Sequence, residues 1–221
     1  MQFSKIGFTP KLIICDLDGT LVDSASDIQY ALNAALADMG LDAVTEHEVR
    51  RWVGRGASRL VHCVLEARHY RKELHDELLA NFMRHYQADV CQTSQLYDGV
   101  AEFIAACQQA HIPLACVTNK PYAPAKDLLA ALNILEPFQL LIGGDTLPHK
   151  KPHPEPLLHC LRYFGVAAKD ALVLGDSSTD IEAALAAHIA CVAVSYGYNH
   201  GEPIEASKPE WIVDSLAEFI G

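Results

Sequence analysis

Two carboxylates stand two positions apart near the start of the chain, in the sequence Asp16-Leu17-Asp18-Gly19-Thr20. Alternate side chains of an extended segment point to the same side, so both carboxylates can face one site. One carboxylate can attack phosphorus while the other protonates the leaving oxygen and then activates water. The same residues also suit an ordinary turn at the end of a strand, and for a DxD pair alone the turn is favoured.

Three further polar groups follow later in the chain. They are Thr118-Asn119-Lys120, the lysine pair in His149-Lys150-Lys151-Pro152-His153-Pro154, and Gly175-Asp176-Ser177-Ser178-Thr179-Asp180. A hydroxyl and an amide can donate hydrogen bonds to phosphate oxygens, and two neighbouring carboxylates can hold Mg²⁺ directly or through water. Each group alone has a simpler interpretation, as a helix cap or as solvated lysines.

In this order, the four segments resemble the motifs of the haloacid dehalogenase-like (HAD) hydrolase superfamily, which include DxDGT, KPxP and GDSxxD. The resemblance implies that Asp16 is the nucleophile that becomes phosphorylated and that Asp18 is the general acid and base. A dehalogenase proper lacks the second aspartate, so Asp18 favours phosphoryl transfer.

The resemblance also implies roles for the second and third motifs. Thr118 binds the transferring phosphate, and Asn119 lies beside it as a further substrate ligand. Lys151 stabilises charge on the nucleophile and on the phosphoryl group, and it also counts among the substrate ligands. We choose Lys151 because it directly precedes Pro152, and we expect Lys150 to be a solvated lysine.

A magnesium site follows from the same resemblance. Its expected ligands are Asp16, Asp18 and Asp176, and Asp180 is expected just outside them, orienting water or Lys151. Mg²⁺ and Lys151 would together offset the repulsion between the nucleophile and a phosphate dianion.

The elements that must hold these groups alternate along the chain. Short apolar runs end at polar or glycine residues, at positions 12–15, 112–117, 140–142, 171–174 and 190–194. Helical segments lie between them, at positions 100–109, 123–132, 154–163 and 180–187. This alternation predicts an α/β fold, a Rossmann-like three-layer α/β/α sandwich with a parallel sheet. Ligands bind at the carboxyl ends of such strands, where the polar groups stand.

The segment from Ser24 to about Gln92 differs, because its apolar residues recur at helical spacing without a convincing strand. Thr45 and Glu48 form a predicted capping box, and Gly40 suits the end of the preceding helix. We therefore predict a catalytic core of residues 1–22 and 97–221 and an inserted α-helical cap of residues 23–96. The resemblance places such a cap over the active site.

The run Trp52-Val53-Gly54-Arg55-Gly56-Ala57-Ser58-Arg59-Leu60 lies between predicted cap helices and resembles the loop that carries specificity. Gly54 and Gly56 would let the backbone approach a ligand, and Arg55 could bind a substrate carboxylate. A solvated Arg55 is an equally open interpretation.

Over nearly the whole chain, the sequence is similar to the phosphoglycolate phosphatase branch of the superfamily. This implies a phosphomonoester hydrolase that converts 2-phosphoglycolate to glycolate and phosphate. Arg55 departs from the uncharged residue expected at its position, so a phosphatase or mutase for a sugar phosphate is the alternative. A non-enzymatic phospho-receiver module would carry its aspartate on a later strand and lack the helical insertion.

Composition narrows the possible partners. The chain has 17 basic and 28 acidic residues, a net charge of −11, without a run of lysine and arginine, which disfavours nucleic acid and anionic membranes. Its seven cysteines are scattered without a CxxC pair and indicate reduced core residues. The N-terminal apolar stretch is too short for a signal peptide. We expect a cytoplasmic monomer or homodimer that acts on a small phosphorylated metabolite.

Overall fold

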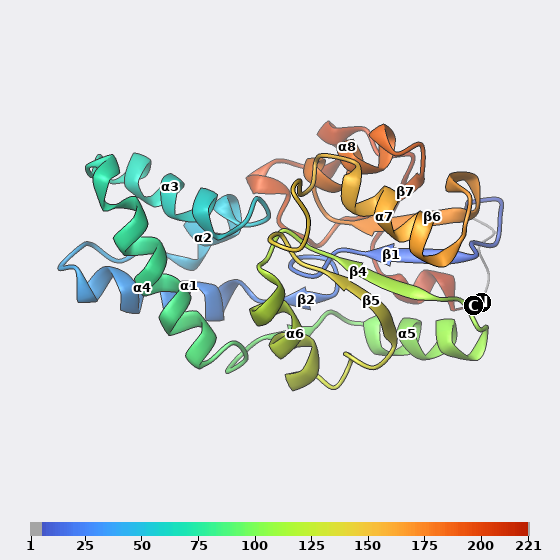
Figure 1. The fold of residues 1–221 in the computed structure, drawn as a ribbon, viewed down its shortest axis with the longest axis horizontal. Coiled ribbons are helices and arrows are strands. Elements are labelled where there is room, and N and C mark those ends of the chain that lie inside the picture. Colours follow the sequence, from blue (N-terminus) through green and yellow to red (C-terminus); the bar gives the residue numbers. More distant parts are fainter. Residues whose placement is uncertain (1–5, 221) are drawn as a thin grey trace.

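A computed structural model describes residues 6–220 of the chain. Six strands form a parallel sheet in the order β5-β4-β1-β6-β7-β8 (Figure 1). Their bounds are β1 (Leu12–Cys15), β4 (Leu114–Val117), β5 (Phe138–Ile142), β6 (Ala171–Gly175), β7 (Ala190–Val194) and β8 (Trp211–Val213). β1 lies in the middle, so the residues that follow it are close to those that follow β4 and β6.

Helices cover both faces of the sheet. Along β1, Ile13 and Cys15 pack on the face covered by α5 and α6, whereas Leu12 and Ile14 pack on the face covered by α7 and α8. The bounds are α5 (Val100–Gln109), α6 (Tyr122–Ala131), α7 (Glu155–Phe164) and α8 (Ser178–Ala186). Short 3₁₀ turns complete the core: η2 (Ala168–Asp170), η3 (Asn199–Gly201), η4 (Ile204–Ser207) and η5 (Leu216–Phe219). The predicted three-layer α/β/α sandwich is confirmed.

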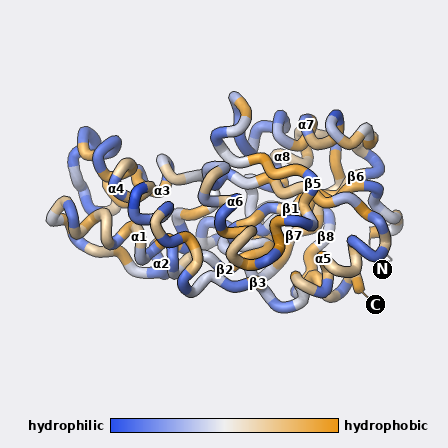
Figure 2. Tube along the Cα trace, turned by 60° about the horizontal axis from the view of Figure 1, so that its bottom comes forward, coloured by the Kyte–Doolittle hydropathy of each residue, from blue (hydrophilic) through white to orange (hydrophobic). Residues whose placement is uncertain are grey.

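The interior of the sheet is apolar throughout. All four residues of β1 and of β4 are buried, as parallel strands covered on both faces require. Figure 2 shows hydrophobic residues along the strands, whereas hydrophilic residues alternate with them along the helices. The seven cysteines are unpaired, and five of them are buried. No helix within residues 6–220 is long and apolar enough to cross a membrane.

The insertion after β1 is helical. It comprises α1 (Ala25–Asp38), α2 (Glu46–Trp52), α3 (Ala57–Ala67), η1 (Lys72–Leu74) and α4 (His75–Ala88), which extend to one side of the core (Figure 1). Thr45 and Glu48 form the predicted capping box at the start of α2. Gly40 has a φ of 66° directly after α1, so it ends that helix as predicted.

Two short strands join the insertion to the core. β2 (Val22–Asp23) and β3 (Gln95–Leu96) pair antiparallel where the chain leaves and re-enters the core. The return segment is held by Asp27 of α1, whose carboxylate accepts hydrogen bonds from the backbone N–H groups of Gln92, Thr93 and Ser94. The strand pair lies at the predicted boundaries of the cap, which otherwise stay a prediction.

Three strands and some element ends differ from the sequence prediction. β2 and β3 have two residues each, and β8 is an edge strand of three residues with one buried side chain, so none leaves a clear hydrophobic period. The predicted strand at 112–117 begins at Leu114, after Pro113, which has no N–H to donate to a neighbouring strand. The helix predicted at 180–187 begins earlier, at Ser178, because Ser177 is its N-cap.

Candidate active site

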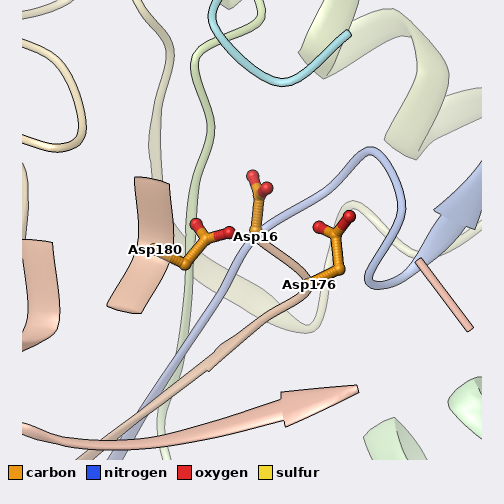
Figure 3. A group of neighbouring side chains, drawn as sticks. All are labelled: Asp16, Asp176 and Asp180. Carbon is orange, nitrogen blue, oxygen red and sulfur yellow. The ribbon is translucent and has the colours of Figure 1, made fainter. Parts of the chain in front are cut away.

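Three carboxylates meet at the carboxyl ends of two neighbouring strands. Asp16 directly follows β1, Asp176 directly follows β6, and Asp180 lies in the first turn of α8 (Figure 3). One oxygen from each lies within 4.8 Å of the others, and all three residues are buried. Parallel pairing of β1 with β6 therefore joins the first and the fourth sequence motif in one place.

Burial makes the negative charge of this group costly. It raises the pKa of Asp16 to about 7, although the positive charge of Lys151 acts in the opposite direction. Burial, together with the charges of Asp180 and Asp16, holds the pKa of Asp176 well above its usual range. A divalent cation would relieve this repulsion, and a set of carboxylate oxygens is the donor set that Mg²⁺ prefers.

Lys151 lies between two of these carboxylates. Its Nζ is 2.9 Å from Oδ1 of Asp16 and 2.6 Å from Oδ1 of Asp180. Burial alone would lower the pKa of Lys151, but Asp16 and Asp180 raise it above its ordinary value, so the ammonium stays charged. Asp180 also accepts hydrogen bonds from Ser177, from N at 3.2 Å and from Oγ at 2.7 Å. It therefore caps α8 and orients Lys151 at once.

Asp18 lies apart from the carboxylate group. Its oxygens accept hydrogen bonds from Nζ of Lys120, at 2.7 and 2.9 Å, and from Oγ of Ser24, at 2.5 Å. The resemblance implied Asp16, Asp18 and Asp176 as metal ligands. In the structure, the three carboxylates that lie close together are those of Asp16, Asp176 and Asp180. The predicted role of Asp18 as a metal ligand stays a prediction, and this side-chain arrangement does not favour it.

Lys120 is the main residue that the sequence interpretation missed. It is the third residue of the Thr118-Asn119-Lys120 group, and it is buried. Its Nζ lies 4.8 Å from the centroid of the Tyr86 ring, which belongs to α4 of the insertion. Its place in a polar group directly after a buried strand was the available signal.

Thr118 and Asn119 follow β4 and are both buried. Thr118 is fixed by its backbone N–H, which donates to the carbonyl of Ile142 at 2.9 Å. Asn119 donates from Nδ2 to the carbonyls of Gly54 and Lys151, at 3.0 and 2.9 Å. The remaining oxygen, Oδ1, has no hydrogen-bond partner in the described part of the chain. Both residues line the cavity above Asp16.

The glycine of the first motif has a steric role. Gly19 has a φ of 88°, and a Cβ at this position would collide with the carboxylate of Asp176. The next residue, Thr20, donates from Oγ1 to Asp176 at 3.0 Å. The first motif therefore packs against the aspartate of the fourth motif and holds it in place.

Tyr198 was also missed, since nothing in its sequence surroundings indicates a role. Its backbone N–H donates to Asp176 at 2.7 Å. Its hydroxyl donates to Asp23 at 2.9 Å and accepts from the N–H groups of Ser24 and Ala25 at 2.9 and 3.1 Å. Tyr198 therefore links the carboxylate group to the segment where the chain enters the helical insertion.

A cavity lies over Asp16, between the core and the helical insertion. From the core, Asp16, Asp18, Thr118, Asn119 and Lys120 line it. The insertion contributes mainly apolar side chains: Ile28, Val53, Ala57, Leu60, Phe82 and Met83. Tyr86 is the one polar side chain from the described residues of the insertion, and Gly54 and Gly56 add backbone. The wall opposite the nucleophile is thus apolar.

Arg55 is not among the residues that line this cavity. It is exposed, and it lines a separate hollow together with Arg51, Arg59 and His200. Its two glycine neighbours turn their backbone towards the cavity, while its own side chain lies on the outer surface. Its predicted contact with a substrate stays a prediction, and this arrangement does not support it.

Comparisons with known proteins agree with the site. The model of the haloacid dehalogenase-like hydrolase family matches residues 13–194. A phosphoglycolate phosphatase of Nitrosococcus oceani is 41% identical over 213 residues, which cover 95% of this chain and 95% of that protein. One of Pseudomonas syringae pv. tomato is 42% identical over 219 residues, covering 97% of this chain and 80% of that protein.

A solved structure extends the similarity to three dimensions. The crystal structure of a predicted phosphoglycolate phosphatase from Haemophilus somnus superposes with a TM-score of 0.92 at 36% identity, covering 97% of this chain and 98% of that one. With its motifs, its fold and these relatives in agreement, the chain belongs to the haloacid dehalogenase-like hydrolase family.

Proposed function

We propose that this protein is a Mg²⁺-dependent phosphomonoester hydrolase that acts through an aspartyl-phosphate, and that its substrate is 2-phosphoglycolate. The observation that carries the proposal is the meeting of Asp16, Lys151 and Asp176 in one buried site beneath a cavity. The phosphatase activity is that of the named relatives, and their similarity extends over almost the whole chain.

Each side chain can perform a defined step. The carboxylate of Asp16 attacks phosphorus, and the bond from phosphorus to the substrate's ester oxygen breaks. Asp18 gives a proton to that leaving oxygen. In the second step, Asp18 removes a proton from a water molecule, which attacks phosphorus, and the bond between phosphorus and the oxygen of Asp16 breaks. Lys151 and Thr118 hold the phosphoryl oxygens during both steps. When bound by Asp16 and Asp176, with Asp180 beside them, Mg²⁺ would neutralise part of the charge that develops there.

The cavity supports a small acidic substrate. Its wall on the cap side is apolar, and Tyr86 is the one cap side chain lining it that could bind a hydroxyl group. On the core side, Lys120 supplies a buried ammonium, which also pairs with Asp18. A short substrate with one carboxylate suits this distribution better than a sugar with several hydroxyl groups.

A sugar phosphate is the second candidate. The fold also occurs in a protein called CbbY from Rhodobacter sphaeroides, crystallised with xylulose-(1,5)bisphosphate, which superposes with a TM-score of 0.81 at 24% identity. That degree of identity concerns the fold alone. A phosphatase and a mutase would share the chemistry at Asp16 and differ in whether water or substrate receives the phosphoryl group.

The test is release of inorganic phosphate from a panel of 2-phosphoglycolate, sugar phosphates and nucleotides, with Mg²⁺ or with EDTA. We expect 2-phosphoglycolate to have the highest kcat/KM, and Asp16→Asn to lower it by at least about 10³-fold. Asp127→Asn, which changes an exposed carboxylate on α6, is the matched control.

Other outcomes decide between the candidates. Preference for a sugar phosphate would keep the mechanism and change the substrate, and return of the phosphoryl group to substrate would indicate a mutase. Activity that survives in Asp16→Asn would refute the assignment of the nucleophile. The unpaired cysteines support our further proposal that the protein acts in the cytoplasm.

A further inference from the structure

The loop between α2 and α3 contacts the core through its backbone. Lys150 donates from Nζ to the carbonyl oxygen of Arg55 at 2.9 Å, and Asn119 donates from Nδ2 to the carbonyl oxygen of Gly54 at 3.0 Å. The two donors come from different loops of the core, one after β5 and the other after β4. Lys150 is exposed, as expected for a solvated lysine, and its ammonium also makes this specific contact with the loop.

The fit between this loop and the core is close. Gly56 has a φ of 89°, and a Cβ there would lie 2.8 Å from Nζ of Lys150 and 3.0 Å from the carbonyl oxygen of Asn119. Gly54 has a φ of 105°, and a Cβ there would lie 3.0 Å from Cε1 of His200. Larger residues at these positions would have to displace the side chains of Lys150 and His200 or the backbone of Asn119.

Lys150 and Lys151 make different contacts, one with the loop and the other with the active site. Lys151 is buried against Asp16, whereas its neighbour Lys150 reaches out to the loop. Asn119 donates to the carbonyl oxygen of Lys151 as well as to the loop. The segment that carries the catalytic lysine is thus tied to the loop by two separate hydrogen-bond donors.

We propose that Lys150 is a positioning residue that holds residues 53–56 against the core and so closes the cavity above Asp16. Val53, Gly54 and Gly56 form part of that cavity's lining, so their position decides whether water is kept away from a bound substrate. The inference rests on the proposed function, since it takes the cavity to be the place where the phosphomonoester binds.

The chemistry of the contact makes the proposal specific. The acceptor is a neutral carbonyl, so a hydrogen-bond donor is needed at this position, not merely a positive charge nearby. Desolvation where the loop contacts it lowers the pKa of Lys150, although the residue as a whole is exposed. Arginine can replace this donor, whereas methionine keeps the length of the side chain and removes the donor.

The experiment compares the wild type with Lys150→Met, Lys150→Arg and Lys169→Met, which changes an exposed lysine in η2. Hydrogen–deuterium exchange followed by mass spectrometry would report on a peptide that covers residues 53–60 and on one from β6. We expect exchange of the loop peptide to become at least about three-fold faster in Lys150→Met alone, with β6 unchanged.

Kinetics supply the second readout. We expect kcat/KM to fall about ten-fold in Lys150→Met, the effect of losing one hydrogen bond to a charged group, and to be largely retained in Lys150→Arg. Lower activity without faster loop exchange would overturn the proposal, and so would faster exchange with unchanged kcat/KM. Circular dichroism checks that each variant is folded.

The experiment distinguishes an error in the role of Lys150 from an error in the proposed substrate. Loop exchange is measured without substrate, so it tests the contact even if 2-phosphoglycolate is not turned over. The kinetic comparison then uses whichever phosphomonoester of the panel is hydrolysed. Unchanged loop exchange in folded Lys150→Met refutes the role of Lys150 whatever the substrate is.

Discussion

Two buried lysines flank the aspartates of the first motif. Lys151 pairs with Asp16 and Asp180, and Lys120 pairs with Asp18. A buried charge is tolerated when it is paired and hydrogen-bonded, and removing one partner leaves the other uncompensated. The two lysines thus keep the nucleophile and the proposed acid in separate environments, although only Leu17 separates Asp16 from Asp18 in sequence.

Replacing Lys120 tests whether the ion pair with Asp18 contributes to stability and to activity. Lys120→Met would leave Asp18 buried without its cation, so we expect the free energy of unfolding to fall by roughly 3 kcal/mol. Phosphate release should fall at least about ten-fold, because Asp18 loses the group that fixes its orientation. Urea unfolding and a phosphate assay measure the two effects.

Lys126→Met changes an exposed lysine on α6 and serves as the control. If Lys120→Met were as stable and as active as this control, the ion pair with Asp18 would have no role in folding or in catalysis.

At the scale of elements, the helices of the cap are joined by polar contacts between their ends. Glu48, in the first turn of α2, accepts hydrogen bonds from Arg68 at the end of α3, at 2.7 and 3.0 Å. It also completes the capping box with Thr45. One carboxylate therefore stabilises the start of one helix and its packing against the next.

This contact should depend on pH. The hydrogen bonds from Arg68, followed by those from Thr45, lower the pKa of Glu48 from 4.5 to about 2 against the opposing effect of burial. Because the pKa is lower in the folded state, the contribution to stability is complete above about pH 4.5 and is lost as the pH falls towards 2.

Glu48→Gln should therefore lower the free energy of unfolding at pH 7, by less than about 1 kcal/mol because solvent screens the pair. The difference from the wild type should vanish near pH 2. Thermal unfolding across this pH range measures it, with Glu102→Gln on the exposed surface of α5 as control. A difference that grows as the pH falls would contradict the interpretation.

At the scale of the molecule, the fold places more negative than positive charge at the carboxyl ends of the central strands. The pairing of β1 with β6 brings Asp16, Asp176 and Asp180 within 4.8 Å of one another, and Lys151 supplies a positive charge between Asp16 and Asp180. The fold therefore holds a site with excess negative charge, and a cation that binds it stabilises the folded state by mass action.

Mg²⁺ should accordingly raise the melting temperature. At a concentration of 100 times its dissociation constant, the gain is about 2.7 kcal/mol, or roughly 5 to 10 °C for a chain of this size. Differential scanning fluorimetry with Mg²⁺ and with EDTA measures the shift. Asp176→Asn should reduce the shift strongly, and Asp127→Asn should leave it unchanged. Equal shifts in both variants would place the cation elsewhere.

The order of motifs, the three-layer fold and a helical insertion after the first strand could all be predicted from the sequence. These features depend on local properties: apolar runs that end in polar residues, helical spacing, a capping box at Thr45 and Glu48, and glycines at turns. Asp16, Lys151, Asp176 and Asp180 became candidates because their motifs stand directly at the ends of strands or the starts of helices.

Only the tertiary structure decided which groups pair across the site. The contacts of Lys120 with Asp18, of Tyr198 with Asp176 and of Lys150 with the carbonyl of Arg55 join loops that follow different strands or belong to the cap. No local pattern specifies them, because they depend on the order of strands in the sheet and on the docking of the cap. For the same reason, the sequence left Arg55 open between a substrate contact and a solvated side chain, whereas in the structure the glycine backbone of the loop lines the cavity and Arg55 lines a separate hollow.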